Sequence, residues 1–119
     1  MKERDFLNWV LDVAKIYRWR WWHVPAPTVW SSKKGAFVPS SSGAGLPDLI
    51  LLHDDPPTLI FAELKGETGQ LSEEQREFLQ LARAVADWTP RPHRRMNTYV
   101  WKPGLEDHIE FILKTRVLT

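Results

Sequence analysis

The chain has 119 residues, of which 43% are hydrophobic, and a formal net charge of +1, which indicates one hydrophobic core and a single domain over residues 1–119. It contains no cysteine, which excludes disulfides and thiolate zinc sites. Residues 41–80 carry 8 acids against 2 Lys/Arg and lie between two basic segments, which fits a cation site flanked by polyanion-binding surfaces as well as an uneven solvated surface.

The first predicted element is an amphipathic helix over residues 3–17, where apolar side chains recur at helical spacing on one face. The aromatic residues 19–24 predict a strand that ends at the prolines following it. Residues 31–45 are typical of long loops around a short strand fragment, "AFV". Two apolar strands, 48–53 and 58–65, are joined by an Asp-Asp-Pro-Pro turn, so we expect an antiparallel hairpin.

The remaining predicted elements are a helix over residues 71–86, a strand over 97–101 and a closing helix over 105–113. Ser72 is the expected N-cap of the second helix. The residues that this helix is expected to bury are Phe78, Leu79, Ala82, Val85 and Ala86. We expect most of the seven tryptophans in the core.

Acidic and basic side chains converge where the predicted hairpin ends. A register centred on its turn places Asp48 opposite Glu63, so two carboxylates share one end of the sheet. Side chains alternate along a strand, so Glu63 and Lys65 project from the same face, with the carbonyl of Leu64 close by. Such oxygens suit Mg²⁺ or Mn²⁺, and the lysine can hold or deprotonate an attacking water or offset charge on phosphorus. Glu63 and Lys65 alone would fit a salt bridge at a sheet edge, but the paired Asp48 favours the metal site.

The segment "GLPDLILL…IFAELKGETGQLSEEQREFL" resembles the virus-type replication-repair nuclease (VRR-NUC) domain of the PD-(D/E)XK nuclease superfamily, a relative of the archaeal Holliday junction resolvases. The resemblance is densest over residues 45–79. It implies an α/β fold with a restriction-endonuclease-like core, in which a central mixed β-sheet is flanked by α-helices in the order α-β-β-β-α-β. It also implies cleavage of DNA phosphodiester bonds with Mg²⁺ or Mn²⁺, leaving 5′-phosphate ends.

The resemblance further implies roles for individual residues. The implied metal ligands are Asp48, Glu63, the backbone carbonyl of Leu64 and Glu3 of the first helix. The implied catalytic residues are Asp48, Glu63, Lys65 and Gln75. An acid such as Glu3 also suits the dipole of a first helical turn, and Ser72 with Gln75 also forms a capping-box pattern.

Candidate DNA contacts lie mostly in the basic segments. The expected phosphate contacts are Lys33, Lys34, Arg91, Arg94 and Arg95, and Ser42 lies in a loop like the serine-bearing loop of the junction resolvases. Trp30 or Trp88, beside basic loops, could stack on unpaired bases. His23 departs from the family's usual surroundings for a histidine before the motif, so we expect a packed side chain there.

The resemblance as a whole predicts a structure-specific endonuclease for branched DNA such as Holliday junctions or flaps. Two symmetric nicks require a homodimer, with an interface from residues 19–22 or from the closing helix. We expect a protein encoded by a bacterium or a phage. We also expect it to act in the cytoplasm, because the longest aliphatic run, residues 49–52, is too short to span a membrane. The alternatives are a restriction-type endonuclease and an inactive DNA-binding module of the same fold.

Overall fold

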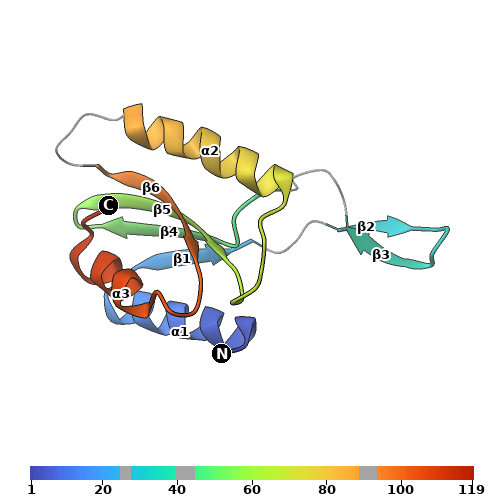
Figure 1. The fold of residues 1–119 in the computed structure, drawn as a ribbon, viewed down its shortest axis with the longest axis horizontal. Helices are drawn as coiled ribbons and strands as arrows, with labels where there is room; N and C mark the ends of the chain where they lie inside the picture. The colour runs from blue at the N-terminus through green and yellow to red at the C-terminus, as the bar shows by residue number, and fades with distance from the viewer. Residues whose placement is uncertain (25–27, 40–44, 89–93) are drawn as a thin grey trace.

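A mixed β-sheet lies at the centre of the described residues, 1–24, 28–39, 45–88 and 94–119, in the computed structural model of this protein (Figure 1). Its strands follow the order β1 (Arg20–His23), β4 (Leu49–Asp54), β5 (Pro57–Leu64) and β6 (Met96–Trp101). The pairs β1–β4 and β4–β5 are antiparallel, and β5–β6 is parallel. This arrangement, with helices on both faces of the sheet, confirms the predicted α/β fold class.

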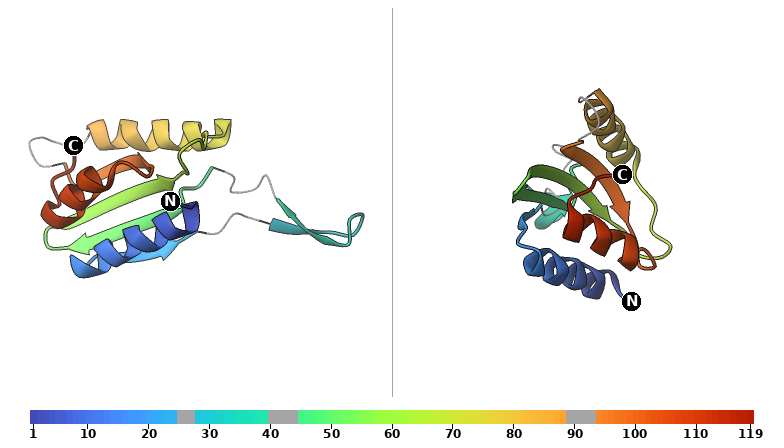
Figure 2. Two further views of the ribbon diagram at one scale, coloured as in Figure 1. Left: turned by 60° about the horizontal axis from the view of Figure 1, so that its bottom comes forward. Right: turned by 90° about the vertical axis from the view of Figure 1, so that its left-hand side faces the viewer.

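The hydrophobic core lies between the sheet and two helices, α1 (Glu3–Ile16) and α3 (Glu106–Thr115), whereas α2 (Glu73–Trp88) covers the other face (Figure 2). Side chains alternate along β4, so Leu49 and Leu51 both enter the buried cluster that α1 and α3 complete. No helix among the residues described is long and apolar enough to cross a membrane.

The helix α2 covers its face of the sheet only in part. Phe78 of α2 meets Phe61 of β5 edge to face, with ring centroids 5.4 Å apart. Ala86 is buried as expected, but Val85 is 57% exposed, so the prediction that Val85 is buried is wrong. Val85 lies about 100° around the helix from Ala86, on the same side as the exposed Leu81, where no strand lies beneath the helix.

The register of the β4–β5 hairpin agrees with the sequence-based prediction. Leu49 pairs with Ala62 and Asp54 with Pro57, which centres the pairing on the turn between them. One further step of this register places Asp48 beside Glu63. The predicted helix and strand boundaries elsewhere agree to within two residues, except in the segment 31–45.

A second, two-stranded sheet projects from the molecule instead of the expected loop (Figure 1). It consists of β2 (Thr28–Ser31) and β3 (Ala36–Pro39), and we call it the β2–β3 arm. The fragment "AFV" is a strand as predicted, but its partner β2 was not predicted. Gly35 occupies the connecting turn with a φ of +62°, a conformation that glycine adopts without strain.

The tryptophans divide between the core and the surface. Trp19 and Trp101 are buried in the core, Trp9 and Trp21 are partly buried and pack against it, and Trp22, Trp30 and Trp88 are exposed. Four of the seven therefore lie in or against the core, as expected. The exposed three lie on an edge strand, on the arm and at the end of α2, positions that no other described element covers.

Candidate active site

Asp48 is held at the start of β4 by hydrogen bonds to both neighbouring strands. The backbone N–H of Leu64, at the end of β5, donates to Asp48 Oδ2 at 2.8 Å. The backbone N–H of Val24, just after β1, donates to the carbonyl oxygen of Asp48 at 2.7 Å. These two bonds fix Asp48 next to the ends of β1 and β5. It therefore lies beside Leu64, whose backbone carbonyl is a metal ligand according to the family resemblance.

The Glu63 carboxylate lies beside Asp48 and is only 2% exposed. Gln75 Nε2 donates to Glu63 Oε1 at 3.1 Å, and Lys65 Nζ lies 3.7 Å from the same oxygen. The second oxygen, Oε2, is buried and has no hydrogen-bond donor among the described residues. One oxygen of the carboxylate is therefore satisfied by the protein, and the other has no donor among the described residues.

This environment raises the pKa of Glu63 to about 8. Burial is the largest cause, the neighbouring Asp48 carboxylate adds to it, and the Lys65 ammonium opposes it only in part. A divalent cation would oppose this shift, because its charge favours the ionised form of the Glu63 carboxylate. The donor-free oxygen and the raised pKa thus fit a metal site built on Asp48 and Glu63.

Gln75 has two roles that the sequence pattern left open as alternatives. The Ser72 N–H donates to Gln75 Oε1 at 2.9 Å, and the Gln75 N–H donates to Ser72 Oγ at 3.1 Å. These reciprocal bonds form the capping box at the start of α2. The remaining amide donor reaches Glu63, so the same side chain caps the helix and orients the carboxylate.

Lys65 lies between the carboxylates and a second, basic cavity. Its backbone N–H donates to the carbonyl of Trp101 at 3.0 Å, which fixes the residue after β5 to the end of β6. A cavity of about 280 Å³ beside it is lined by two further cations, Arg76 and Lys102, neither of which was predicted from the sequence. Lys102 Nζ donates to the carbonyl of Gly69 at 3.0 Å. The basic lining suits a phosphate next to the carboxylate pair.

A cavity of about 310 Å³ opens on the other side of Asp48. Glu3 lines it together with Arg4 and His23. His23 is exposed, so the expectation of a packed histidine is wrong; it is the last residue of an edge strand and therefore has a neighbouring strand on one side only. Arg4 was missed, and its only signal is its place next to Glu3. Within the described part of the chain, no three His, Asp or Glu side chains are grouped closely enough to hold a metal ion, so the carboxylate pair lies apart from Glu3.

The predicted DNA contacts fall into three groups. Lys33 and Lys34 are exposed at the turn of the β2–β3 arm. Ser42 and Arg91 lie outside the described residues. Arg94 and Arg95 are described, but their surroundings are those of structural side chains.

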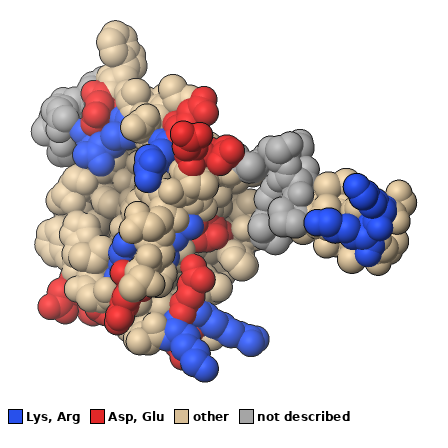
Figure 3. All heavy atoms as spheres, turned by 45° about the vertical axis from the view of Figure 1, so that its right-hand side comes forward, with Lys and Arg blue, Asp and Glu red and all other residues tan. Residues whose placement is uncertain are grey.

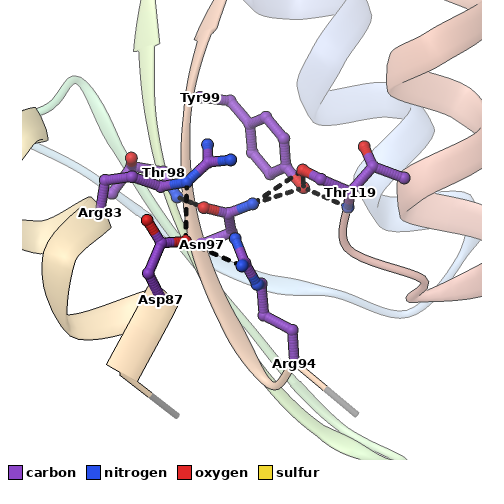
Figure 4. A network of polar contacts seen from close by, with 7 residues as sticks. All are labelled: Arg83, Asp87, Arg94, Asn97, Thr98, Tyr99 and Thr119. Carbon is purple, nitrogen blue, oxygen red and sulfur yellow. Dashed lines mark hydrogen bonds and ion pairs between the residues drawn. The ribbon is translucent and has the colours of Figure 1, made fainter. Parts of the chain in front are cut away.

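Arg94 is 9% exposed and points at Asp87 of α2, with Nη2 2.8 Å from Oδ1 (Figure 4). Arg95 is half-buried and donates to Thr58 Oγ1 at 3.3 Å and to the carbonyl of Arg116 at 3.5 Å. Both guanidinium groups join distant elements within the fold. The structure therefore does not favour their predicted contacts with DNA phosphates, because such contacts need exposed donors.

Comparison with known families identifies the segment that contains this site. The model of the VRR-NUC domain matches residues 38–85. No curated protein and no solved structure matches the chain. The matched segment includes Asp48, Glu63, Lys65 and Gln75, which the fold brings together, and a nuclease domain implies DNA as the substrate. Residues 38–85, with the carboxylate and lysine site that they contain, therefore match the VRR-NUC domain, a family of nuclease domains.

Proposed function

We propose that this protein is an endodeoxyribonuclease that uses Mg²⁺ or Mn²⁺ to hydrolyse phosphodiester bonds of branched DNA, such as Holliday junctions or flaps, and acts as a homodimer. The observation that carries the proposal is the carboxylate pair of Asp48 and the buried Glu63, with the pKa of Glu63 raised to about 8 and Lys65 Nζ 3.7 Å from Glu63 Oε1. A pair of acids beside an ammonium is suited to a cation and a phosphate together.

The metal would be held by Asp48, by Glu63 and by the carbonyl of Leu64. The buried Oε2 of Glu63, which has no donor among the described residues, supports this assignment. When bound, a divalent cation supplies Lewis-acid chemistry to the scissile phosphate. Gln75 keeps Oε1 of Glu63 occupied, so that Oε2 remains available for the cation.

Lys65 acts on the reacting groups themselves. Its side chain is mostly buried, so its ammonium is a preorganised charge beside the carboxylates. We propose that this ammonium holds the attacking water by donating a hydrogen bond to its oxygen and offsets the charge that develops on the phosphate. Arg76 and Lys102 would hold the next phosphate along the strand, because they line the cavity on the far side of Lys65.

The homodimer follows from the symmetry of a four-way junction. Resolution of a junction needs two nicks related by a two-fold axis, and this chain carries one carboxylate and lysine site in its described residues. Trp22 on the edge strand β1 and Phe111 on α3 are both exposed, which supports an apolar interface in one of the two segments that the sequence suggested.

Cleavage assays on a panel of DNA structures test this function. Labelled four-way junctions, flaps, linear duplex and single strands, of one common sequence, are incubated with the protein and Mg²⁺ or Mn²⁺. We expect a branched substrate to be cut first, at a position that follows the branch point rather than the sequence, and Lys65→Ala, slowed roughly 10²-fold, to be the low-activity control. Failure to cut any substrate with either metal would contradict the proposal, and cleavage at a fixed sequence would favour the restriction-type alternative.

A further inference from the structure

The β2–β3 arm exposes an aromatic pair that has no structural purpose within the described fold. Trp30 of β2 and Phe37 of β3 are cross-strand partners that meet edge to face, with centroids 5.3 Å apart. They remain 56% and 70% exposed. The arm points away from the sheet and helices, so these rings do not contribute to the hydrophobic core (Figure 2). Exposed aromatic rings on a projecting element are typical of a binding surface.

The charge of the arm indicates a polyanionic partner. Residues 28–39 contain Lys33 and Lys34 but no acid, and both lysines are exposed at the turn. Figure 3 shows basic side chains at the end of the arm and no acidic ones on it. These ammonium groups have no acid on the arm to pair with, so they suit a partner with closely spaced negative charges, and nucleic acid supplies a phosphate for each.

The position of the arm brings it next to the candidate active site. The chain enters the arm five positions after His23 and leaves it nine positions before Asp48. Both of these residues line the 310 Å³ cavity. A DNA strand whose phosphate lies at Asp48 and Glu63 would therefore run close to the base of the arm.

We propose that the β2–β3 arm binds the DNA substrate by stacking Trp30 and Phe37 on an unpaired base, while Lys33 and Lys34 contact the neighbouring phosphates. Every base has a face for stacking, but in an intact duplex those faces are covered by the adjacent base pairs. The arm thus selects DNA with an unstacked base, such as a branch point or a bulge, without reading its sequence. This inference rests on the proposed nuclease function for the place where the DNA lies.

Binding of two matched duplexes tests the arm without relying on cleavage. One duplex carries a single unpaired 2-aminopurine, the other is fully paired, and affinity is measured by anisotropy with Ca²⁺ and again with EDTA. We expect the wild-type protein to prefer the duplex with the unpaired base by about tenfold, the scale of one base stacked on an aromatic ring, and to quench its fluorescence. Trp30→Ala/Phe37→Ala should lose the preference and the quenching but bind the paired duplex as before.

Three further variants separate stacking from other effects. Trp30→Leu/Phe37→Leu keeps an apolar cross-strand pair but removes the ring faces, so it should lose the preference with the arm still folded. Ile16→Ala removes an apolar side chain that is 70% exposed on α1, and it should behave like the wild type. Lys33→Ala/Lys34→Ala should weaken binding to both duplexes and lower the salt dependence by up to about two units of slope.

Each outcome decides between the arm and the nuclease separately. If both aromatic double variants keep the preference for the unpaired base, the arm proposal is overturned even when the protein cleaves DNA. The arm proposal is also overturned if these variants alter the mass of the protein in light scattering but leave DNA binding unchanged. That result would assign the arm to a contact between copies of the chain. If the wild type discriminates between the duplexes but cuts no substrate, the arm stands and the nuclease function fails.

Discussion

Glu63 occupies a position that a stability requirement alone would not favour. Its carboxylate is buried beside a second carboxylate, and one oxygen finds no donor among the described residues. Burying an acid in this way costs free energy of folding unless a cation compensates for it. Such locally unfavourable groups are concentrated at functional sites. Lys65 Nζ lies 3.7 Å from Glu63 Oε1, so the two predictions at this scale concern the separate roles of the carboxylates and the ammonium.

Asp48→Asn and Lys65→Ala should separate metal binding from the chemical step. The asparagine can still accept the hydrogen bond from the Leu64 N–H, so the fold is kept while one anionic oxygen is lost. We expect it to lose metal affinity and activity together. Lys65→Ala should bind metal and DNA nearly as the wild type does but cleave roughly 10²-fold more slowly, because it lacks one preorganised charge. Calorimetric titration measures the metal affinity of each variant, and single-turnover cleavage measures its rate. If Lys65→Ala cleaves at the wild-type rate, Glu63 and Lys65 form only a salt bridge.

The stability of the metal-free protein should depend on the ionisation of Glu63. Its folded pKa of about 8 is above the ordinary value of 4.5, so the folded state holds the proton more tightly than the unfolded state. The contribution of Glu63 to the free energy of unfolding is therefore greatest below pH 4.5. It decreases as the pH rises to about 8, by an amount on the order of a few kcal/mol.

Urea unfolding at several pH values between 5 and 8 measures this effect. Glu63→Gln should remove most of the decrease, because its amide does not titrate in this range. Adding Mn²⁺ to the wild type should remove it as well, since the cation favours the ionised carboxylate. A wild-type protein whose stability is the same at pH 5 and pH 8 would contradict the raised pKa.

Among the elements, the loop before β4 and the first turn of α2 together position the site. Gly45 lies directly against the backbone of Glu74, and its φ of +94° is one that other residues rarely adopt. Asp48 follows three residues later, and Gln75 lies next to Glu74 in the helix. Close packing of these two backbones therefore brings Asp48 from the loop and the side-chain amide of Gln75 from the helix to Glu63.

Gly45→Ala should disturb this contact. An added Cβ would collide with the carbonyl group of Glu74, in addition to the unfavourable φ, so we expect a loss of roughly 1–3 kcal/mol in stability. Metal affinity should fall as well, because Asp48 would shift. Gly66→Ala is the matched control, since no atom lies within 4 Å of its added Cβ and its φ is not positive. Equal unfolding midpoints for the two variants would rule out the packing role of Gly45.

At the scale of the whole molecule, apolar surface remains exposed beside the site-bearing sheet. The edge strand β1 presents Trp22, and the outer side of α2 presents Leu81, Val85 and Trp88. Exposed apolar side chains of this kind are typical of a protein–protein contact. The proposed homodimer would cover Trp22 on β1, one of the two segments that the sequence suggested for the interface.

Light scattering should accordingly give a mass of about twice the 13.9 kDa of the chain. Trp22→Asp should yield a monomer, because it places a charge in the proposed interface. This variant should lose paired nicking of a four-way junction but still nick a flap, since each chain keeps its own carboxylates and lysine. A wild-type monomer, both free and on a junction, would remove the resolvase form of the proposal.

The sequence by itself determined the elements and the register that place the site. Alternating apolar residues on both sides of an Asp-Asp-Pro-Pro turn were enough to predict that Asp48 lies beside Glu63, since hairpin pairing is a local property of the chain. The capping box of Ser72 and Gln75 was predictable for the same reason, as its partners are three residues apart.

Only the tertiary structure decided which side chains are covered and which are free. The burial of Arg94 against Asp87, the exposure of His23 and Val85, and the basic lining beside Lys65 all depend on elements far apart in the sequence. The pairing of β2 with β3 was likewise hidden, because its residues resemble a loop in composition. Local patterns set the conformation of each segment, but exposure and partners are set by where the other segments pack, which no single stretch of sequence encodes.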